Sequence, residues 1–114
     1  MNPFDSSFQL LSKALDIASL RHKTIANNLA NANTPGYHRL VVDFQGELDR
    51  ALDGREPLKA RIVEANDPAG PDGNNVSFDR ELADLQKNAL IFQTFAQFAD
   101  GRLKSLRSAI QGQF

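Results

Sequence analysis

Apolar residues recur with the four-three spacing of a coiled-coil helix in two stretches near opposite ends of this 114-residue chain. The first stretch runs from Phe4 to Ala32 and is interrupted only by His22. The second runs from Phe78 to Ile110 without interruption. We therefore expect a mainly α protein in which long N- and C-terminal helices pair as an antiparallel, coiled-coil-like hairpin.

Helix-start and helix-stop residues predict a first helix over 3–33 and a second over 77–112. The first helix is expected to stop where Thr34-Pro35-Gly36 supplies a proline and a turn glycine. Ser77 suits the N-cap of the second helix, whose acidic residues lie near its start and whose basic residues lie toward its end. A chain of this length has room for one domain, so 1–114 is expected to be a single unit.

The middle segment, residues 34–76, differs in composition from both helices. It contains four of the five prolines and five of the seven glycines. Phe44, Leu48 and Leu52 predict one or two helical turns, and partial alternation over 58–64 predicts a short strand. Such a polar segment makes little core by itself, so we expect an irregular connection that holds a short helix and short strands.

Composition excludes several classes of function. The 13 Lys and Arg residues nearly balance the 14 Asp and Glu residues, so the chain lacks the basic character of a nucleic-acid-binding domain. The absence of cysteine excludes disulfides, thiol nucleophiles and cysteine metal sites, and two histidines are too few for a histidine-rich cluster. Apolar runs stay shorter than the roughly 18 residues of a membrane helix, and the first residues do not resemble a cleaved signal peptide. We expect no cofactor and no membrane insertion.

Titratable residues do not fall into the spacing of a known catalytic motif. His22 lies on the first apolar seam, and we interpret it as a packed or interface histidine. The acidic residues of both helices are interpreted as solvated or helix-end charges. The loop around Asp67 and Asp72 lacks the spacing of a calcium-binding loop, and turn chemistry explains it better. Enzymatic activity is therefore not expected.

Asparagines crowd the end of the first predicted helix, at positions 27, 28, 31 and 33. Asparagine disfavours helix unless its side chain binds backbone or a partner. A helix stop explains Asn33 and the turn after it, but not the other three residues. We interpret the segment as a recognition surface that leads into a tight turn.

The two apolar seams leave two possibilities open, an intramolecular coiled coil or a subunit whose core is completed by other subunits. A second apolar stripe, Ile91, Phe95 and Phe98, runs beside the seam of the second helix. Because one helix partner covers about one seam, this helix is expected to face two or more neighbours. The residues expected to pack or to mediate assembly are Phe8, Leu11, Leu15, Ile25, Leu29, Leu82, Leu85, Phe92, Leu103 and Leu106.

The asparagine segment resembles the N-terminal signature of bacterial flagellar axial proteins, the family of rod, hook and hook-junction subunits. The residues at the positions of that signature are Asn28, Asn31, Thr34, Pro35, Gly36 and Tyr37. Residues 72–76, 79–85 and 103–110, together with the short length, are similar to the proximal-rod members of that family. The resemblance implies that the signature residues set the helix end and contacts between subunits.

The resemblance also implies a structural, non-enzymatic subunit of the proximal rod in the flagellar basal body, required for motility. Its terminal helices would pack with those of neighbours and transmit torque from the membrane ring to the distal rod and hook. The implied partners are copies of itself, FlgC-like rod proteins, hook–basal-body adaptor and membrane-ring proteins, and the flagellar type III export apparatus. The implied location is the periplasmic rod, reached without a cleaved signal peptide. The alternative is a helical adaptor or export chaperone that does not polymerise.

Overall fold

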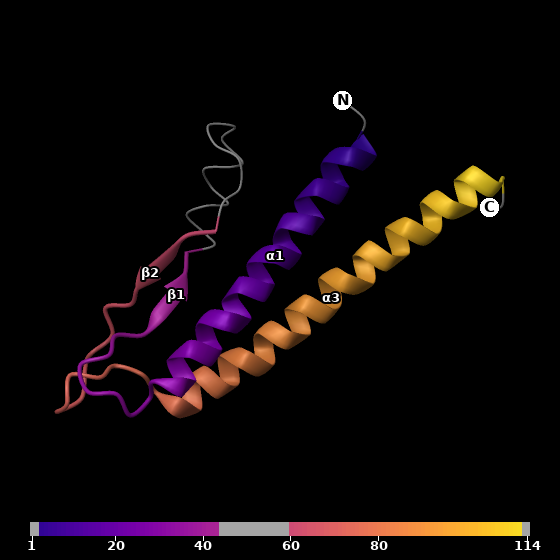
Figure 1. The fold of residues 1–114 in the computed structure, drawn as a ribbon. Coiled ribbons are helices and arrows are strands. Elements are labelled where there is room, and N and C mark those ends of the chain that lie inside the picture. Colours follow the sequence, from indigo (N-terminus) through magenta and orange to yellow (C-terminus); the bar gives the residue numbers. More distant parts are fainter. Residues whose placement is uncertain (1–2, 44–59, 113–114) are drawn as a thin grey trace.

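The computed structural model describes residues 3–43 and 60–112, which form a helical hairpin with a short pair of strands beside it (Figure 1). Helix α1 (Pro3–Ala30) and helix α3 (Phe78–Gln111) run antiparallel. They meet where the chain leaves α1 and where it enters α3, and we call this the closed end. The predicted mainly α hairpin with an irregular middle is confirmed.

Helix α1 ends three residues before the predicted position 33. The Asn31 N–H still donates to the carbonyls of Asn27 and Asn28, at 3.2 and 3.1 Å, but the Thr34 N–H then donates to the Asn31 carbonyl in a turn. The Asn31 side-chain amide also donates to the Asn27 carbonyl, at 2.9 Å. Side-chain and turn bonds thus replace helical ones before the proline is reached.

Helix α3 begins and ends at residues that suit its two caps. The Ser77 hydroxyl accepts a hydrogen bond from the Arg80 N–H at 3.5 Å, which confirms the predicted N-cap. At the other end Gly112 adopts a left-handed conformation with φ of 71°, and its N–H donates to the Ala109 carbonyl. This is a common way to terminate a helix, because glycine adopts positive φ without steric cost.

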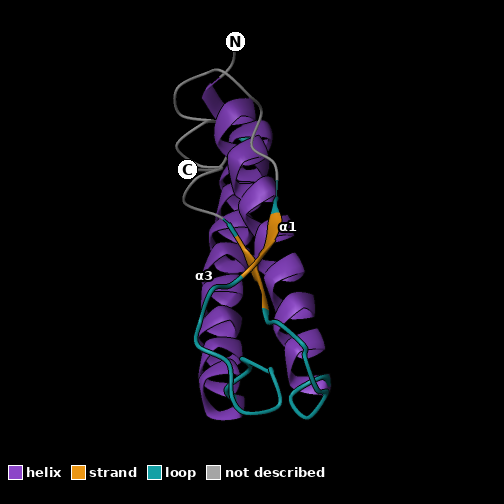
Figure 2. Ribbon diagram, turned by 90° about the vertical axis from the view of Figure 1, so that its left-hand side faces the viewer, coloured by secondary structure: helices purple, strands orange, loops and turns teal. Residues whose placement is uncertain are grey.

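The strands β1 (Leu40–Val42) and β2 (Ile62–Glu64) form an antiparallel pair in which Val41 lies opposite Val63. Figure 2 shows this ribbon lying over the helices, and β1 contacts α1. Of the strand predicted over 58–64, the structure has Ile62–Glu64 as strand β2. Positions 58 and 59 of that prediction lie outside the described residues. The helical turns predicted from Phe44, Leu48 and Leu52 lie outside the described residues.

The molecule is elongated, with extents of 64 × 30 × 13 Å and a radius of gyration of 18.0 Å. A compact domain of this length has a radius of gyration of about 13 Å. The two helices diverge from the closed end toward the chain termini (Figure 1). A hairpin of this shape buries little surface away from the closed end.

The buried core of the described residues is more polar than apolar. The buried apolar residues are Ile17, Ala18, Ile25 and Val42. The buried polar residues are Thr24, Asn28, Arg39, Asn74, Asn75, Glu81 and Asn88. Hydrogen bonds therefore carry much of the specificity of this fold.

In the described part of the chain, neither helix has a stretch that is apolar enough to cross a membrane.

Candidate functional site

Five buried polar residues meet at the closed end and form what we call the polar cluster. They are Asn28 from α1, Arg39 before β1, Asn74 and Asn75 before α3, and Glu81 in the first turn of α3. They come from three stretches of the chain, at residue 28, at residue 39 and over 74–81. The polar cluster therefore joins the helices, the turn and the strand pair at one point.

Asn28 is fully buried and its side-chain amide makes four hydrogen bonds. Its Oδ1 accepts from the Leu40 N–H at 2.9 Å and from the Tyr37 hydroxyl at 3.0 Å. Its Nδ2 donates to the Leu40 carbonyl at 2.8 Å and to Glu81 Oε2 at 3.2 Å. One side chain thus ties α1 to the start of β1 and to α3.

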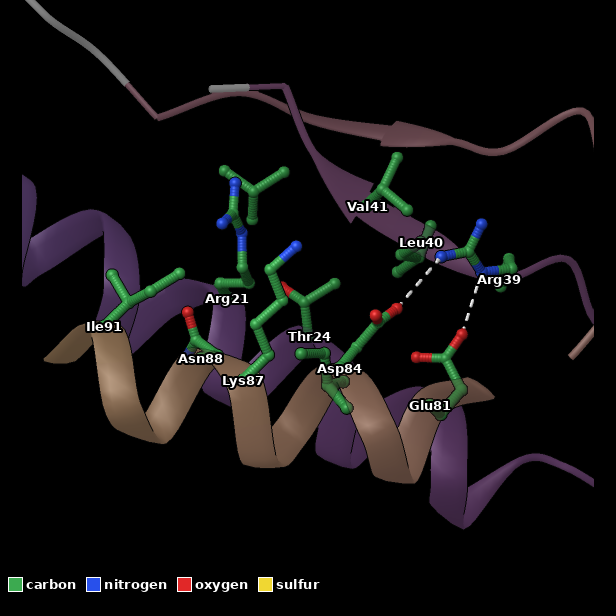
Figure 3. Close-up of a pocket in the computed structure, with 12 residues that line it drawn as sticks. Arg21, Thr24, Arg39, Leu40, Val41, Glu81, Asp84, Lys87, Asn88 and Ile91 are labelled. Atoms are coloured by element: carbon green, nitrogen blue, oxygen red, sulfur yellow. Dashed lines mark hydrogen bonds and ion pairs between the residues drawn. The ribbon is translucent and has the colours of Figure 1, made fainter. Parts of the chain in front are cut away.

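Arg39 and Glu81 form a buried ion pair in the polar cluster. Arg39 Nε donates to Glu81 Oε1 at 2.8 Å, and the two side chains are 8% and 1% exposed. The guanidinium also donates to Asp67 at 2.5 Å and lies 3.9 Å from the Asp84 carboxylate (Figure 3). Glu81 lies in the first turn of α3, as a helix-end charge would, but it is not solvated. Arg39 approaches from another segment and compensates its burial.

These contacts shift the pKa values of Arg39 and Asp67. Burial by itself lowers the pKa of Arg39, but the hydrogen bonds to Glu81 and Asp67, together with the attraction of their charges, raise the pKa above its ordinary value. The hydrogen bond from Arg39 lowers the pKa of Asp67. Both groups therefore carry their charges at neutral pH.

Asn74 attaches the loop before α3 to the turn after α1. Its side-chain amide donates to the carbonyls of Asn31 and Thr34, at 2.9 and 2.8 Å. The Gly36 N–H donates to the Asp72 carbonyl at 2.8 Å. Asp72 also accepts from the Asn74 N–H through its carboxylate, at 3.1 Å. The explanation of this loop by turn chemistry is confirmed at Asp72, whereas Asp67 forms ion pairs with Arg39 and Arg80. The loop residues also bind a second segment.

Asn75 performs a similar role one residue later. Its Oδ1 accepts from the Arg39 N–H at 2.6 Å, and its Nδ2 donates to the carbonyls of Ala65 and Asp67 at 3.0 and 3.2 Å. The side chain thus joins the segments before β1 and after β2. Together the two asparagines hold the middle segment against the closed end.

Gly36 and Tyr37 place the signature turn in this network. Gly36 has φ of 73°, and its Cα lies 3.3 Å from the Cβ position that Gly73 lacks, so two glycines allow the turn and the loop to approach closely. The Tyr37 hydroxyl donates to Asn28 and accepts from the Asn27 amide at 2.9 Å. Burial raises the pKa of Tyr37. Because Asn28 is fully buried, it is unavailable to a recognition surface, whereas Pro35 and Gly36 stay exposed.

Half of the ten residues expected to mediate packing are exposed in the single chain. On α3, Leu82, Phe92, Leu103 and Leu106 are 41–51% exposed, and Leu85 is half-buried. On α1, Ile25 is buried and Phe8 is exposed. Three further residues are partly exposed: Leu11, Leu15 and Leu29. The structure brings Ile25 into the core and leaves most of the α3 seam uncovered.

The two helices border an apolar groove of about 330 Å³ to which residues from both seams contribute. It is lined by Ala18, Ser19, His22, Lys23, Asn88, Ala89 and Phe92, without a residue of β1 or β2. His22 is exposed at this groove, so it is not packed within the chain. A second cleft, of about 220 Å³, lies beneath β1 and has a more polar lining (Figure 3).

The polar cluster is arranged to hold segments together. Its ionisable members Arg39 and Glu81 are bound to each other, and Asp67 is bound to Arg39. Within the described ranges, acidic and histidine side chains do not gather into a group of three that could hold a metal ion. The chemistry at the closed end is therefore that of a structural joint.

Sequence reasoning missed three of the residues that matter most, Arg39, Glu81 and Asn88. A signal for two of them was present, since Glu81 and Asn88 are polar residues seven positions apart, directly before Leu82 and Ala89 of the apolar seam. Such spacing places them on one helix face. Arg39 had no comparable signal, because its partners come from distant parts of the chain.

A family model described as "Flagella basal body rod protein" matches residues 8–38, the stretch that holds the asparagine segment and the signature turn. The chain is also 30% identical to the flagellar basal body rod protein FlgB of Borrelia hermsii, over 97% of this chain and 100% of the relative. It is 31% identical to FlgB of Bacillus subtilis, over 98% of each chain, and 32% identical to FlgB of Aquifex aeolicus, over 91% of this chain and 92% of the relative. With similarity that extends over nearly the full length of these relatives, the chain belongs to the FlgB family of flagellar basal body rod proteins.

Proposed function

We propose that this rod protein is a non-enzymatic structural subunit of the proximal rod. It assembles with its neighbours by helix packing and transmits torque from the membrane ring to the distal rod and hook. The relatives described above are rod proteins rather than enzymes, which supports a structural role. The observation that carries the proposal is the apolar surface of α3.

That surface, which we call the outer seam, consists of Leu82, Phe92, Leu103, Leu106 and Ile110, which are 41–78% exposed. It follows a helix of 34 residues, which at 1.5 Å per residue is about 50 Å long. Contiguous exposed apolar surface of this kind marks an interaction site in a soluble protein. A row with helical spacing suits a helix from another subunit as its partner.

The apolar groove supports the same mode of packing. It takes Ala18 and His22 from the seam of α1 and Ala89 and Phe92 from the seam of α3. Small side chains such as Ala18 and Ala89 allow a neighbouring helix to approach closely. Both seams can therefore contact one neighbour along the same line.

The polar cluster supports the transmission of torque. A subunit under load must keep its helices in a constant relative position, and hydrogen bonds are more directional than apolar contacts. Asn28 and Glu81 bind each other across the two helices, and Arg39 adds the strand pair. The closed end is thereby suited to pass force between segments.

Membership of the family supports association with other components of the flagellar basal body. We propose FlgC-like rod proteins, the hook–basal-body adaptor, membrane-ring proteins and further copies of this chain as neighbours. Delivery to the periplasmic rod is proposed to use the flagellar type III export apparatus without a cleaved signal. The small apolar core among the described residues suits a subunit that unfolds for export.

The proposal is tested by placing a charge on the outer seam. Leu103→Asp should abolish motility and give basal bodies without a complete rod in electron micrographs, because a carboxylate would be buried between subunits. Ser105→Asp is the matched control, since Ser105 is exposed on the same helix but away from the seam, and it should preserve motility.

Circular dichroism should show equal helix content for both variants, because neither residue is buried in the free chain. Normal motility with Leu103→Asp would contradict the proposal. A strain that lacks the protein separates the alternative role: complete basal bodies would indicate a non-polymerising adaptor or chaperone, and a missing rod supports the structural subunit.

A further inference from the structure

We propose that the cleft beneath β1 receives the side-chain amide of Gln93 from a neighbouring copy of this chain. The inference rests on the proposed function, because it names one contact through which copies of the rod subunit assemble. It assigns a role to a buried oxygen of Asn88 and to a row of exposed glutamines on α3.

The lining of this cleft contains a buried acceptor without a hydrogen-bond partner. Asn88 is 2% exposed, and its Nδ2 donates to the Ala18 carbonyl of α1 at 2.8 Å. This bond fixes the orientation of the amide, because a flipped amide would place its oxygen against the Ala18 carbonyl oxygen. The Oδ1 of Asn88 points toward the cleft (Figure 3) and lacks a hydrogen-bond partner in the described part of the chain. Since a buried carbonyl without a partner lowers stability, the cleft offers a site to an entering donor.

The charges around the cleft favour a donor that is neutral. Positive and negative side chains both contribute to the lining: Arg21, Arg39, Lys87, Glu81 and Asp84. An entering carboxylate would face the Asn88 oxygen and the Asp84 carboxylate, whereas an entering ammonium would face the Lys87 ammonium. A neutral amide avoids both conflicts. Its N–H donates to Asn88, and its carbonyl accepts from Lys87, whose side chain extends beside Asn88 (Figure 3).

The size and the apolar walls of the cleft suit a glutamine side chain. The cleft has a volume of about 220 Å³, whereas one water takes up roughly 30 Å³ in the liquid. Apolar side chains from each of the surrounding elements line part of it: Ile25 of α1, Val42 of β1 and Ile91 of α3. The methylene groups of an entering side chain can pack against them. Glutamine has two such groups and asparagine has one, so glutamine reaches further into the cleft from the surface of a neighbour.

Helix α3 carries exposed glutamines on a different face from the cleft. Three of them form what we call the glutamine row: Gln86, Gln93 and Gln97. At 3.6 residues per turn, they lie within roughly 40° of one another and roughly 140–180° from Asn88 around the helix axis. Gln93 is the central member of the row. The exposed residues Ala89 and Leu90 beside it are apolar, as are the walls of the cleft.

The positions of the cleft and the glutamine row determine the kind of contact. Because they lie on different faces of one molecule, the glutamine row of one copy binds the cleft of the next, and the row of that copy remains available. Such a heterologous contact generates rings or helical assemblies rather than closed pairs. A contact of this kind suits a subunit of a rod.

The inference is tested by disulfide cross-linking in isolated basal bodies, since the chain itself has no cysteine. One cysteine is placed at the cleft by Ile91→Cys and a second in the glutamine row by Gln93→Cys. Oxidation of basal bodies that carry both substitutions should give a ladder of dimers, trimers and longer multimers on a non-reducing gel, because the contact repeats from copy to copy. Each single variant should give no ladder, because its cysteine does not face a second one.

The matched control combines Ile91→Cys with Gln9→Cys, because Gln9 is an exposed glutamine on α1. It should give no ladder, and a ladder equal to that of the first pair would overturn the inference. If Ile91→Cys prevents rod formation, Lys87→Cys replaces it, since Lys87 is exposed and lines the same cleft. Basal bodies that carry the Gln93 pair without a ladder, or with a disulfide to a different protein instead, would also overturn the inference.

A second measurement tests the amide itself. Gln93→Glu keeps the size of the side chain but replaces its N–H donors with a carboxylate oxygen, which the Asn88 oxygen repels. The number of complete rods per cell should fall several-fold. Gln9→Glu makes the same change at an exposed position of α1, and it should preserve the number of rods. The melting temperature of the free chain should be the same for both variants, because neither side chain is buried.

Unchanged rod numbers in Gln93→Glu would overturn the proposed contact. This failure is distinguishable from failure of the proposed function, which depends on Leu103→Asp. A missing rod in Leu103→Asp, together with no ladder from the Gln93 pair, would support the structural subunit and reject the contact between Gln93 and the cleft.

Discussion

At the scale of single residues, Asn28 shows how completely one side chain can be used inside the fold. A side-chain amide offers two donor hydrogens and two acceptor lone pairs. Asn28 makes two donor and two acceptor contacts, with Leu40, Tyr37 and Glu81. Aspartate lacks the donors and leucine lacks all four groups, so asparagine is the residue that fits this position.

Asn28→Ala should lower the free energy of unfolding by about 3–4 kcal/mol, because it leaves both backbone groups of Leu40 and one oxygen of Glu81 without their buried partner. Urea unfolding followed by circular dichroism measures this loss. Asn33→Ala is the control, since Asn33 is exposed in the same segment, and it should change the free energy by less than about 0.5 kcal/mol. Equal losses in the two variants would contradict the role given to Asn28.

The ion pair of Arg39 and Glu81 contributes differently. A buried ion pair is weak evidence for stability, because the desolvation of both charges offsets their attraction. Removing one partner is costly, since the other charge stays buried alone. The pair therefore acts mainly by excluding arrangements in which Arg39 and Glu81 are apart.

At the scale of the element, the pattern of α3 predicted its extent more accurately than its orientation. Ser77 and Gly112 cap the helix because their chemistry acts on the adjacent backbone. Its two buried residues, Glu81 and Asn88, could not be assigned partners from the pattern, because their hydrogen bonds are with Arg39, Asn28 and the Ala18 carbonyl. A regular seam of apolar residues identifies a surface to be covered, but not the molecule that covers it.

Gly101 is a weak point within α3 that has no evident packing role. A Cβ at this position would meet no other atom within 4 Å. Gly101→Ala should therefore raise the free energy of unfolding by about 1 kcal/mol, since alanine loses less conformational freedom on helix formation. Thermal unfolding measures the gain. Gly112→Ala should instead lower the free energy of unfolding, because the positive φ of 71° disfavours a side chain. The same gain in the free energy of unfolding at both positions would contradict this explanation.

At the scale of the whole molecule, order is concentrated at the closed end. The polar cluster and buried residues such as Ile25 and Val42 lie in the half of the hairpin that contacts the strand pair. Toward the chain termini the helices diverge and leave Leu103 and Ile110 exposed. The free subunit therefore has one well-connected end and one end whose apolar residues lack partners.

Amide hydrogen exchange of the free subunit should be slowest around Ile25 and Asn28 and fastest in α3 beyond Leu103, because local opening is easiest where few buried contacts hold the helix. Exchange followed by mass spectrometry measures this gradient. In assembled rods the protection beyond Leu103 should rise most. Uniform protection along α3 in the free subunit would contradict this account.

The sequence by itself determined the two long helices, the cap at Ser77 and the stop near the signature turn. These features depend on residues a few positions apart, which the local chemistry of the backbone makes predictable. The asparagine segment was also sufficient to indicate the family, which the comparisons with FlgB relatives confirm. Its individual asparagines could not be assigned partners in this way.

Only the tertiary structure decided which polar residues are buried and which way α3 faces. Asn28 and Glu81 are 53 positions apart, and Asn88 and Ala18 are 70 positions apart. Contacts across such distances leave no periodic trace, since each depends on how the hairpin closes. The apolar seam of α3 was therefore visible in the sequence, but the burial of Glu81 and Asn88 beside it was not, because it depends on hydrogen bonds with α1 and with Arg39.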